Sequence, residues 1–73
     1  MSAVDKRILQ VLKAERRWMT FDELYTMSQC KCNWVDFALQ LEQLVEQGYA
    51  QHILLRGMDV GLYRIAGRNV NGE

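Results

Sequence analysis

The change of pattern at Gly48 constrains the fold of this chain more than any other sequence feature. Before it, residues 33–47 carry apolar side chains at helical spacing, and after it two runs of β-favouring residues follow in "YAQHILLRGMDVGLYRIAG". Glycine tolerates the left-handed backbone with which many helices end. The sequence therefore predicts a helix that stops at Gln47 and a β-hairpin directly behind it, with its turn at residues 56–59.

The helix over residues 33–47 has a well-marked beginning and one apolar face. Asn33 is a good N-cap, and Asp36 in the first turn places a carboxylate near the positive end of the helix dipole. At about 100° per residue, six side chains share a face that we expect to lie in the core. These are Trp34, Phe37, Ala38, Leu41, Leu44 and Val45.

Two shorter helices are predicted before this one. Residues 4–15 show amphipathic helical spacing, and residues 21–28 follow a strong start signal. There Thr20 and Glu23 have the spacing of a capping box, and Met19 can pack against Leu24 as a hydrophobic staple. The second helix is expected to bury three side chains, Phe21, Leu24 and Tyr25.

The connection between these two helices carries Trp18 and Met19, which we predict to form a short third strand against the hairpin. Both tryptophans, Trp18 and Trp34, are expected to anchor the core, because one covers it from the connection and the other lies on an apolar helix face.

Length and composition indicate one small globular domain. The chain has 73 residues, of which 49% are hydrophobic and 25% charged. We expect a domain over residues 1–66 and a flexible polar tail over 67–73. No apolar run approaches the length of a membrane span, and the opening "MSAVDKR" lacks the apolar core of a secretory signal, so a cytoplasmic protein without a membrane partner is expected.

The predicted order of helix, helix, turn, helix and hairpin is the plan of a winged helix-turn-helix, an α+β fold with a two-stranded wing. The segments "ALQLEQLVEQGYAQHI" and "GLYRIAG" resemble the third helix and wing of small bacterial winged-helix transcriptional regulators, particularly those that control plasmid-borne fimbriae. The resemblance covers residues 4–66. It implies a DNA-binding regulator whose third helix enters the major groove.

A weaker resemblance links the same residues to the ferrous-iron-transport accessory proteins, another small winged-helix family with a cysteine-rich wing. Here the wing from Leu55 to Tyr63 contains no cysteine. The cluster chemistry of that family is therefore not expected in this chain.

Charge decides how such a chain would hold double-stranded DNA. The net charge is zero, and residues 33–47 contain three carboxylates and no cation. Glutamines on the third helix can read adenine edges, while phosphates must be held by residues outside it. Because few contacts imply weak binding by a monomer, a homodimer on two half-sites is expected. The predicted DNA-binding residues are Lys31, Asn33, Gln40, Gln43, Arg56 and Arg64.

The same charges support a second hypothesis, a winged-helix protein-interaction module. Carboxylates that repel phosphate suit a partner protein with a basic surface. In this hypothesis Glu42 and Glu46 attract the partner, and Val35 and Leu39 form an apolar contact patch.

Catalytic and metal chemistry find little support in the sequence. The chain has one histidine, no phosphate-cradling glycine loop and no pairing of nucleophile and base, so it is not expected to be an enzyme. Cys30 and Cys32 with His52 would supply three ligands, whereas structural zinc sites use four. We therefore expect no metal and no cofactor, structural or incidental cysteines, and His52 at the surface or at a sheet edge. The alternatives for the two cysteines are a redox switch or a site shared between subunits.

Overall fold

A computed structural model describes residues 2–57 and 60–67 of the chain. Within these residues the chain forms three helices and three strands, and the helices predicted from the sequence are confirmed to within one residue at each end. In chain order the elements are α1 (Ala3–Glu15), β1 (Met19–Thr20), α2 (Phe21–Ser28), α3 (Trp34–Glu46), β2 (Ala50–Leu54) and β3 (Gly61–Ile65).

The strands form an antiparallel sheet in which β3 lies between β1 and β2. The predicted hairpin is confirmed, with Ala50 opposite Ile65 and Leu54 opposite Gly61. The predicted third strand is also found, one residue later than expected, because Met19–Thr20 pairs with β3. The hairpin residues 58–59 and the predicted tail beyond Gly67 lie outside the described residues.

Side-chain caps explain where the helices begin. Thr20 and Glu23 form the predicted capping box, in which the Glu23 amide donates to Thr20 Oγ1 and the Thr20 amide donates to Glu23 Oε1, both at 3.1 Å. At the start of α3 the Asp36 amide donates to Asn33 Oδ1 at 2.9 Å. Gly48, with φ +87°, follows the end of α3 as predicted.

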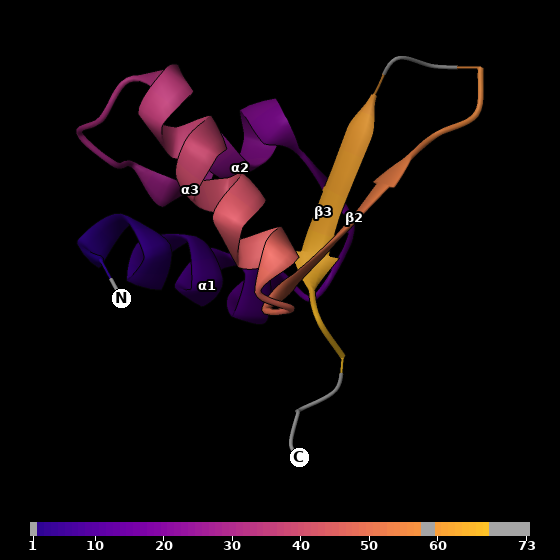
Figure 1. Cartoon of the computed structure of the whole chain (residues 1–73), viewed down its shortest axis with the longest axis horizontal. Helices are drawn as coiled ribbons and strands as arrows, with labels where there is room; N and C mark the ends of the chain where they lie inside the picture. The colour runs from indigo at the N-terminus through magenta and orange to yellow at the C-terminus, as the bar shows by residue number, and fades with distance from the viewer. Residues whose placement is uncertain (1, 58–59, 68–73) are drawn as a thin grey trace.

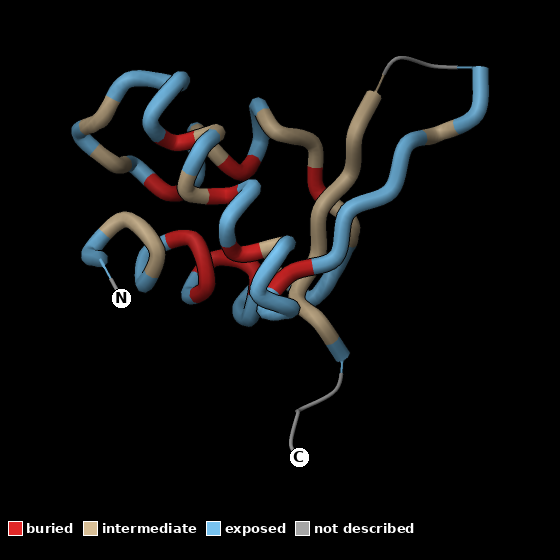
Figure 2. Tube along the Cα trace, viewed as in Figure 1, coloured by how far each residue is buried: buried red, intermediate tan, exposed pale blue. Residues whose placement is uncertain are grey.

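The core lies where the three helices meet the sheet (Figures 1 and 2). It includes the predicted Leu24 of α2 and Phe37, Leu41 and Leu44 of α3. The predicted Phe21, Tyr25 and Val45 are only partly buried, at the edge of this cluster. The residues with less than 2% exposure and an apolar side chain are Ile8, Leu12, Met19, Leu24, Phe37, Leu41 and Leu44.

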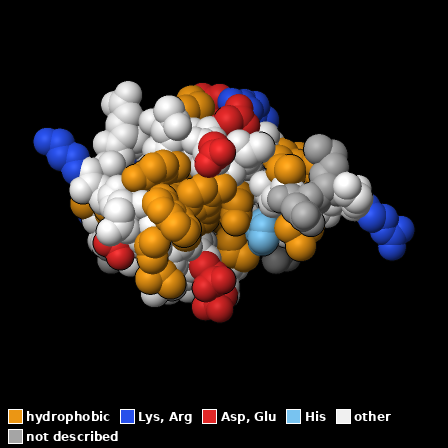
Figure 3. Space-filling view, turned by 90° about the horizontal axis from the view of Figure 1, so that it is seen from above, with side chains coloured by type: hydrophobic (Ala, Val, Ile, Leu, Met, Phe, Trp, Pro, Cys, Tyr) orange, Lys and Arg blue, Asp and Glu red, His pale blue; other side chains and the backbone are white. Residues whose placement is uncertain are grey.

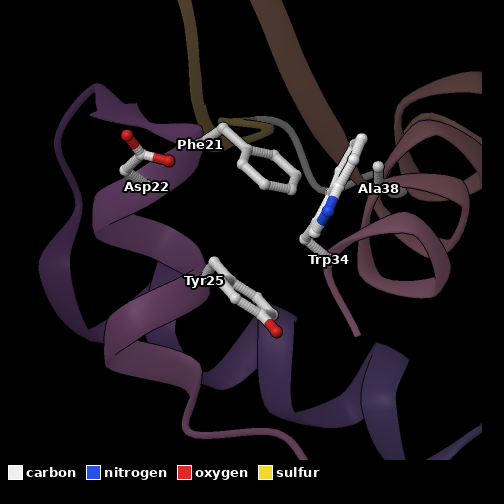
Figure 4. A pocket seen from close by; sticks show the side chains of 5 residues that line it. All are labelled: Phe21, Asp22, Tyr25, Trp34 and Ala38. Carbon is white, nitrogen blue, oxygen red and sulfur yellow. The ribbon is translucent and has the colours of Figure 1, made fainter. Parts of the chain in front are cut away.

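The structure corrects the two predictions made for tryptophan. Trp34 is 63% exposed and not a core anchor. It is the first residue of α3, and its ring stands across an open space from Phe21 and Tyr25 of α2 (Figure 4). Trp18 is half-buried and stands outside the core cluster. The Arg64 guanidinium lies over the Trp18 ring, with its central carbon 5.3 Å from the ring centroid.

The fold is thus α+β, with helices gathered on one side of a small antiparallel sheet and the β2–β3 hairpin projecting beside them (Figure 1). This arrangement is compatible with the layout of a winged helix. No helix among residues 2–57 and 60–67 has the length and apolar character needed to span a bilayer.

Candidate binding surface

A groove opens between the start of α2 and the start of α3 (Figure 4). Its volume is about 480 Å³, and most of its lining is apolar. We call it the aromatic groove, and its lining residues are Phe21, Asp22, Tyr25, Trp34 and Ala38.

Packing against the core holds two of the three aromatic rings in place. Phe21 and Tyr25 stack at 6.0 Å between centroids, and both meet the buried Phe37 ring edge-on, at 5.5 and 5.0 Å. The Tyr25 hydroxyl also donates a hydrogen bond of 2.8 Å to the Cys32 carbonyl, which ties α2 to the segment that precedes α3. One wall of the groove is therefore preformed.

Trp34 supplies the opposite wall. Figure 4 shows its ring facing Phe21 across the groove, with Tyr25 below them. The Asn33 cap sets the direction in which α3 leaves the loop, and so fixes where the Trp34 backbone stands. The next exposed apolar residues of α3, Val35 and Leu39, are 46% and 53% exposed. The groove thus continues into an apolar surface on α3.

Carboxylates surround this apolar surface. Asp22 lines the groove, and Asp36, Glu42 and Glu46 are exposed on α3. Figure 3 shows hydrophobic side chains in the middle of the face over α2, α3 and the hairpin, with acidic side chains around them. Glu42 also lies near the Tyr63 hydroxyl, whose pKa is raised by burial first and by this carboxylate second. Lys and Arg side chains also project in this view, at the two ends of the face and at its upper edge, so the charges that stand nearest the apolar middle are carboxylates.

The residues predicted to hold DNA phosphates lie apart from one another. Lys31 is in the loop between α2 and α3, and Arg56 follows β2, at the opposite end of the molecule (Figure 1). Arg64 neighbours Tyr63 on β3, and Tyr63 pairs with the buried Met19, so Arg64 occupies the outer sheet face. The three cations therefore do not converge beside α3.

The predicted base-reading residues are divided as well. Gln43 is exposed on α3, whereas Gln40 is half-buried. The side-chain oxygen of Asn33 already accepts the cap hydrogen bond from Asp36. Leu39 occupies the centre of the exposed face of α3, because it lies about 170° around the helix axis from the mean direction of the buried Leu41 and Leu44.

Several other arginines are engaged by neighbours within the fold. Arg17 forms ion pairs of 3.2 Å with both Glu15 and Glu23. The Arg7 Nε donates to the Ser28 carbonyl at 2.8 Å and thereby joins α1 to the end of α2. These side chains contribute to local structure and are not among the residues that line the aromatic groove.

Cys30 and Cys32 are free and half-buried beside the core. Burial raises the pKa of the Cys30 thiol, and the neighbouring Cys32 raises it further. Among the described residues no group of three or more metal-ligand side chains comes together. His52 lies on the edge strand β2, as predicted, and stacks on Tyr63 at 4.4 Å between centroids.

Sequence reasoning missed the aromatic groove because it assigned all three rings to the core. A signal was present in the position of Trp34 at the very start of a helix, where a side chain projects past the end of the packed segment. The spacing of aromatic residues along the chain does not by itself distinguish a ring buried in the core from a ring that lines a surface groove.

No protein-family model matches the chain, and neither the curated proteins nor the solved structures give a match.

Proposed function

We propose that this chain is a protein-docking module of winged-helix type, and that its aromatic groove and the adjoining face of α3 bind a basic amphipathic segment of a partner protein. The observation that carries the proposal is an exposed apolar groove with Asp22 in its lining, which adjoins a face of α3 that carries three exposed carboxylates. Apolar surface provides the affinity, and the surrounding charges select a cationic partner.

The DNA-binding function predicted from the sequence has weaker support. A helix that enters the major groove needs cations beside it to neutralise phosphates. Here Lys31 and Arg56 lie at opposite ends of the molecule and Arg64 lies on Trp18. The carboxylates of α3 would face the phosphates, which is unfavourable.

Binding to defined probes separates these functions. The probes are a 15-residue amphipathic helix of leucine and lysine, its leucine and glutamate counterpart, a scrambled leucine and lysine peptide, and a 20-base-pair duplex, each measured by fluorescence anisotropy at low salt. We expect the basic amphipathic peptide to bind, and the acidic peptide, the scrambled peptide and the duplex to bind at least tenfold more weakly. Tighter binding of the duplex would reject the docking function.

A charge-matched pair of variants tests the electrostatic part. Glu42→Gln with Glu46→Gln removes two carboxylates from α3, and Gln10→Lys with Ala14→Lys adds two cations to exposed positions of α1. Both variants raise the net charge by the same amount. We expect the α3 variant to weaken peptide binding roughly fivefold, the scale of two exposed ion pairs, and the α1 variant to weaken it much less. Equal effects would show that only net charge matters.

A further inference from the structure

We propose that the aromatic groove receives one arginine side chain of the partner segment, whose guanidinium lies between Trp34 and the pair formed by Phe21 and Tyr25. This inference rests on the proposed docking function and names the side chain that the groove selects.

The three rings provide the electrostatic environment that a delocalised cation prefers. The faces of aromatic rings carry negative potential, and a cation within about 6 Å of a ring centroid is attracted to it. Trp34, Phe21 and Tyr25 stand around one common space in Figure 4, and they come from two different helices. A cation in this space would meet more than one aromatic face.

Asp22 adds a carboxylate to the lining of the same groove. It is exposed and stands next to Phe21 at the start of α2. Figure 4 shows it on the side of Phe21 away from Trp34, where its charge attracts a cation in the groove without standing between the rings. The groove therefore combines flat apolar walls with a single anionic edge.

Arginine fits this combination better than lysine or an aliphatic side chain. Its guanidinium is planar, stacks on aromatic faces and is less strongly hydrated than an ammonium group. A leucine would fill part of the apolar space but has no charge for Asp22 to attract. The fold already contains the same type of contact, since Arg64 lies over Trp18 at 5.3 Å.

The experiment uses the two tryptophans as separate reporters. Trp18→Phe leaves Trp34 as the reporter inside the groove and retains an aromatic ring for Arg64, and Trp34→Phe leaves Trp18 as a reporter outside it. Each protein is titrated with the basic amphipathic peptide carrying arginine, lysine, citrulline or leucine at one central position of its apolar face. Citrulline keeps the shape of arginine and removes its charge.

We expect the arginine peptide to bind about tenfold more tightly than the citrulline and leucine peptides, with lysine between them, and to change the fluorescence of Trp34 but not of Trp18. Trp34→Leu should abolish the preference for arginine over leucine, and Asp22→Asn should reduce it. Circular dichroism checks that each variant is folded.

Two results would overturn the inference. Binding of the leucine peptide as tightly as the arginine peptide would identify the groove as a general apolar pocket. The docking function would still stand if peptide binding depended on Glu42 and Glu46. An unchanged preference for arginine in Trp34→Leu would place the cation elsewhere. Failure of every basic peptide to bind would instead reject the docking function itself.

Discussion

Replacing Trp34 with alanine should weaken the fold only slightly, although tryptophan is the largest side chain of α3. A fully buried aromatic side chain covers about 150–250 Å². Because Trp34 is 63% exposed, roughly a third of that area is buried. At about 25 cal/mol per Å² the loss is about 1–2 kcal/mol, which is an upper bound because unfolded chains already bury some surface.

Phe37→Ala provides the comparison, because Phe37 is fully buried and supports the rings of Phe21 and Tyr25. Its expected cost is about 3–5 kcal/mol. A domain of this size is stable by roughly 4–11 kcal/mol. At the lower end of that range the Phe37 variant should be close to unfolding while the Trp34 variant remains folded.

Urea unfolding followed by circular dichroism measures both free energies. A loss of 3 kcal/mol or more for Trp34→Ala would refute the reasoning, since it would mean that the ring is packed as part of the core and the groove is not open. A small loss of unfolding free energy together with a loss of peptide binding would assign Trp34 to the surface that binds the partner.

Three further predictions concern the helix cap and the sheet. Thr20→Ala should cost about 1 kcal/mol in urea unfolding, because it leaves the Glu23 amide without its acceptor; no loss would mean that water replaces the cap. The Thr20 amide first and Arg17 second lower the pKa of Glu23 below its unfolded value. Its charge therefore stabilises the fold above the ordinary glutamate pKa, and this contribution disappears as the pH falls through the folded value, so wild type should lose more stability on acidification than Glu23→Gln; parallel pH profiles would contradict this. A Cβ on Gly61 would lie 2.6 Å from His52 Nε2, so Gly61→Ala should displace His52 from Tyr63 at a cost of about 0.5–1.5 kcal/mol, and the cost should vanish in a His52→Ala background.

Local sequence signals were sufficient for the elements of this fold. Thr20 with Glu23 and Asn33 with Asp36 bond within four residues of chain, so the beginnings of α2 and α3 are fixed by neighbours in sequence. The hairpin follows from strand propensity on both sides of a turn, and its register is set by pairing across that turn. These interactions could therefore be predicted without knowledge of the rest of the molecule.

The binding surface depended on distances that no local signal encodes. The three predicted phosphate contacts come from a loop, a wing and a strand, and whether they converge is decided by how these elements are arranged in space. Arg64 and Gln43 satisfy the residue types needed for DNA, but their positions in the fold separate them. The residue types of α3 show that it is acidic, but they carry no information about where the lysine and arginine side chains of the chain lie relative to it.

Trp34 has one property that follows from the sequence and another that follows only from the tertiary structure. Its helical phase, shared with Phe37 and Leu41, was determined by the sequence, because the spacing of residues on a helix is fixed. Its exposure was decided only in three dimensions, because burial requires another element to cover the ring, and α2 leaves a groove beside that position. Sequence determines the direction in which a side chain points around its own helix, and tertiary packing determines whether another element covers that side chain.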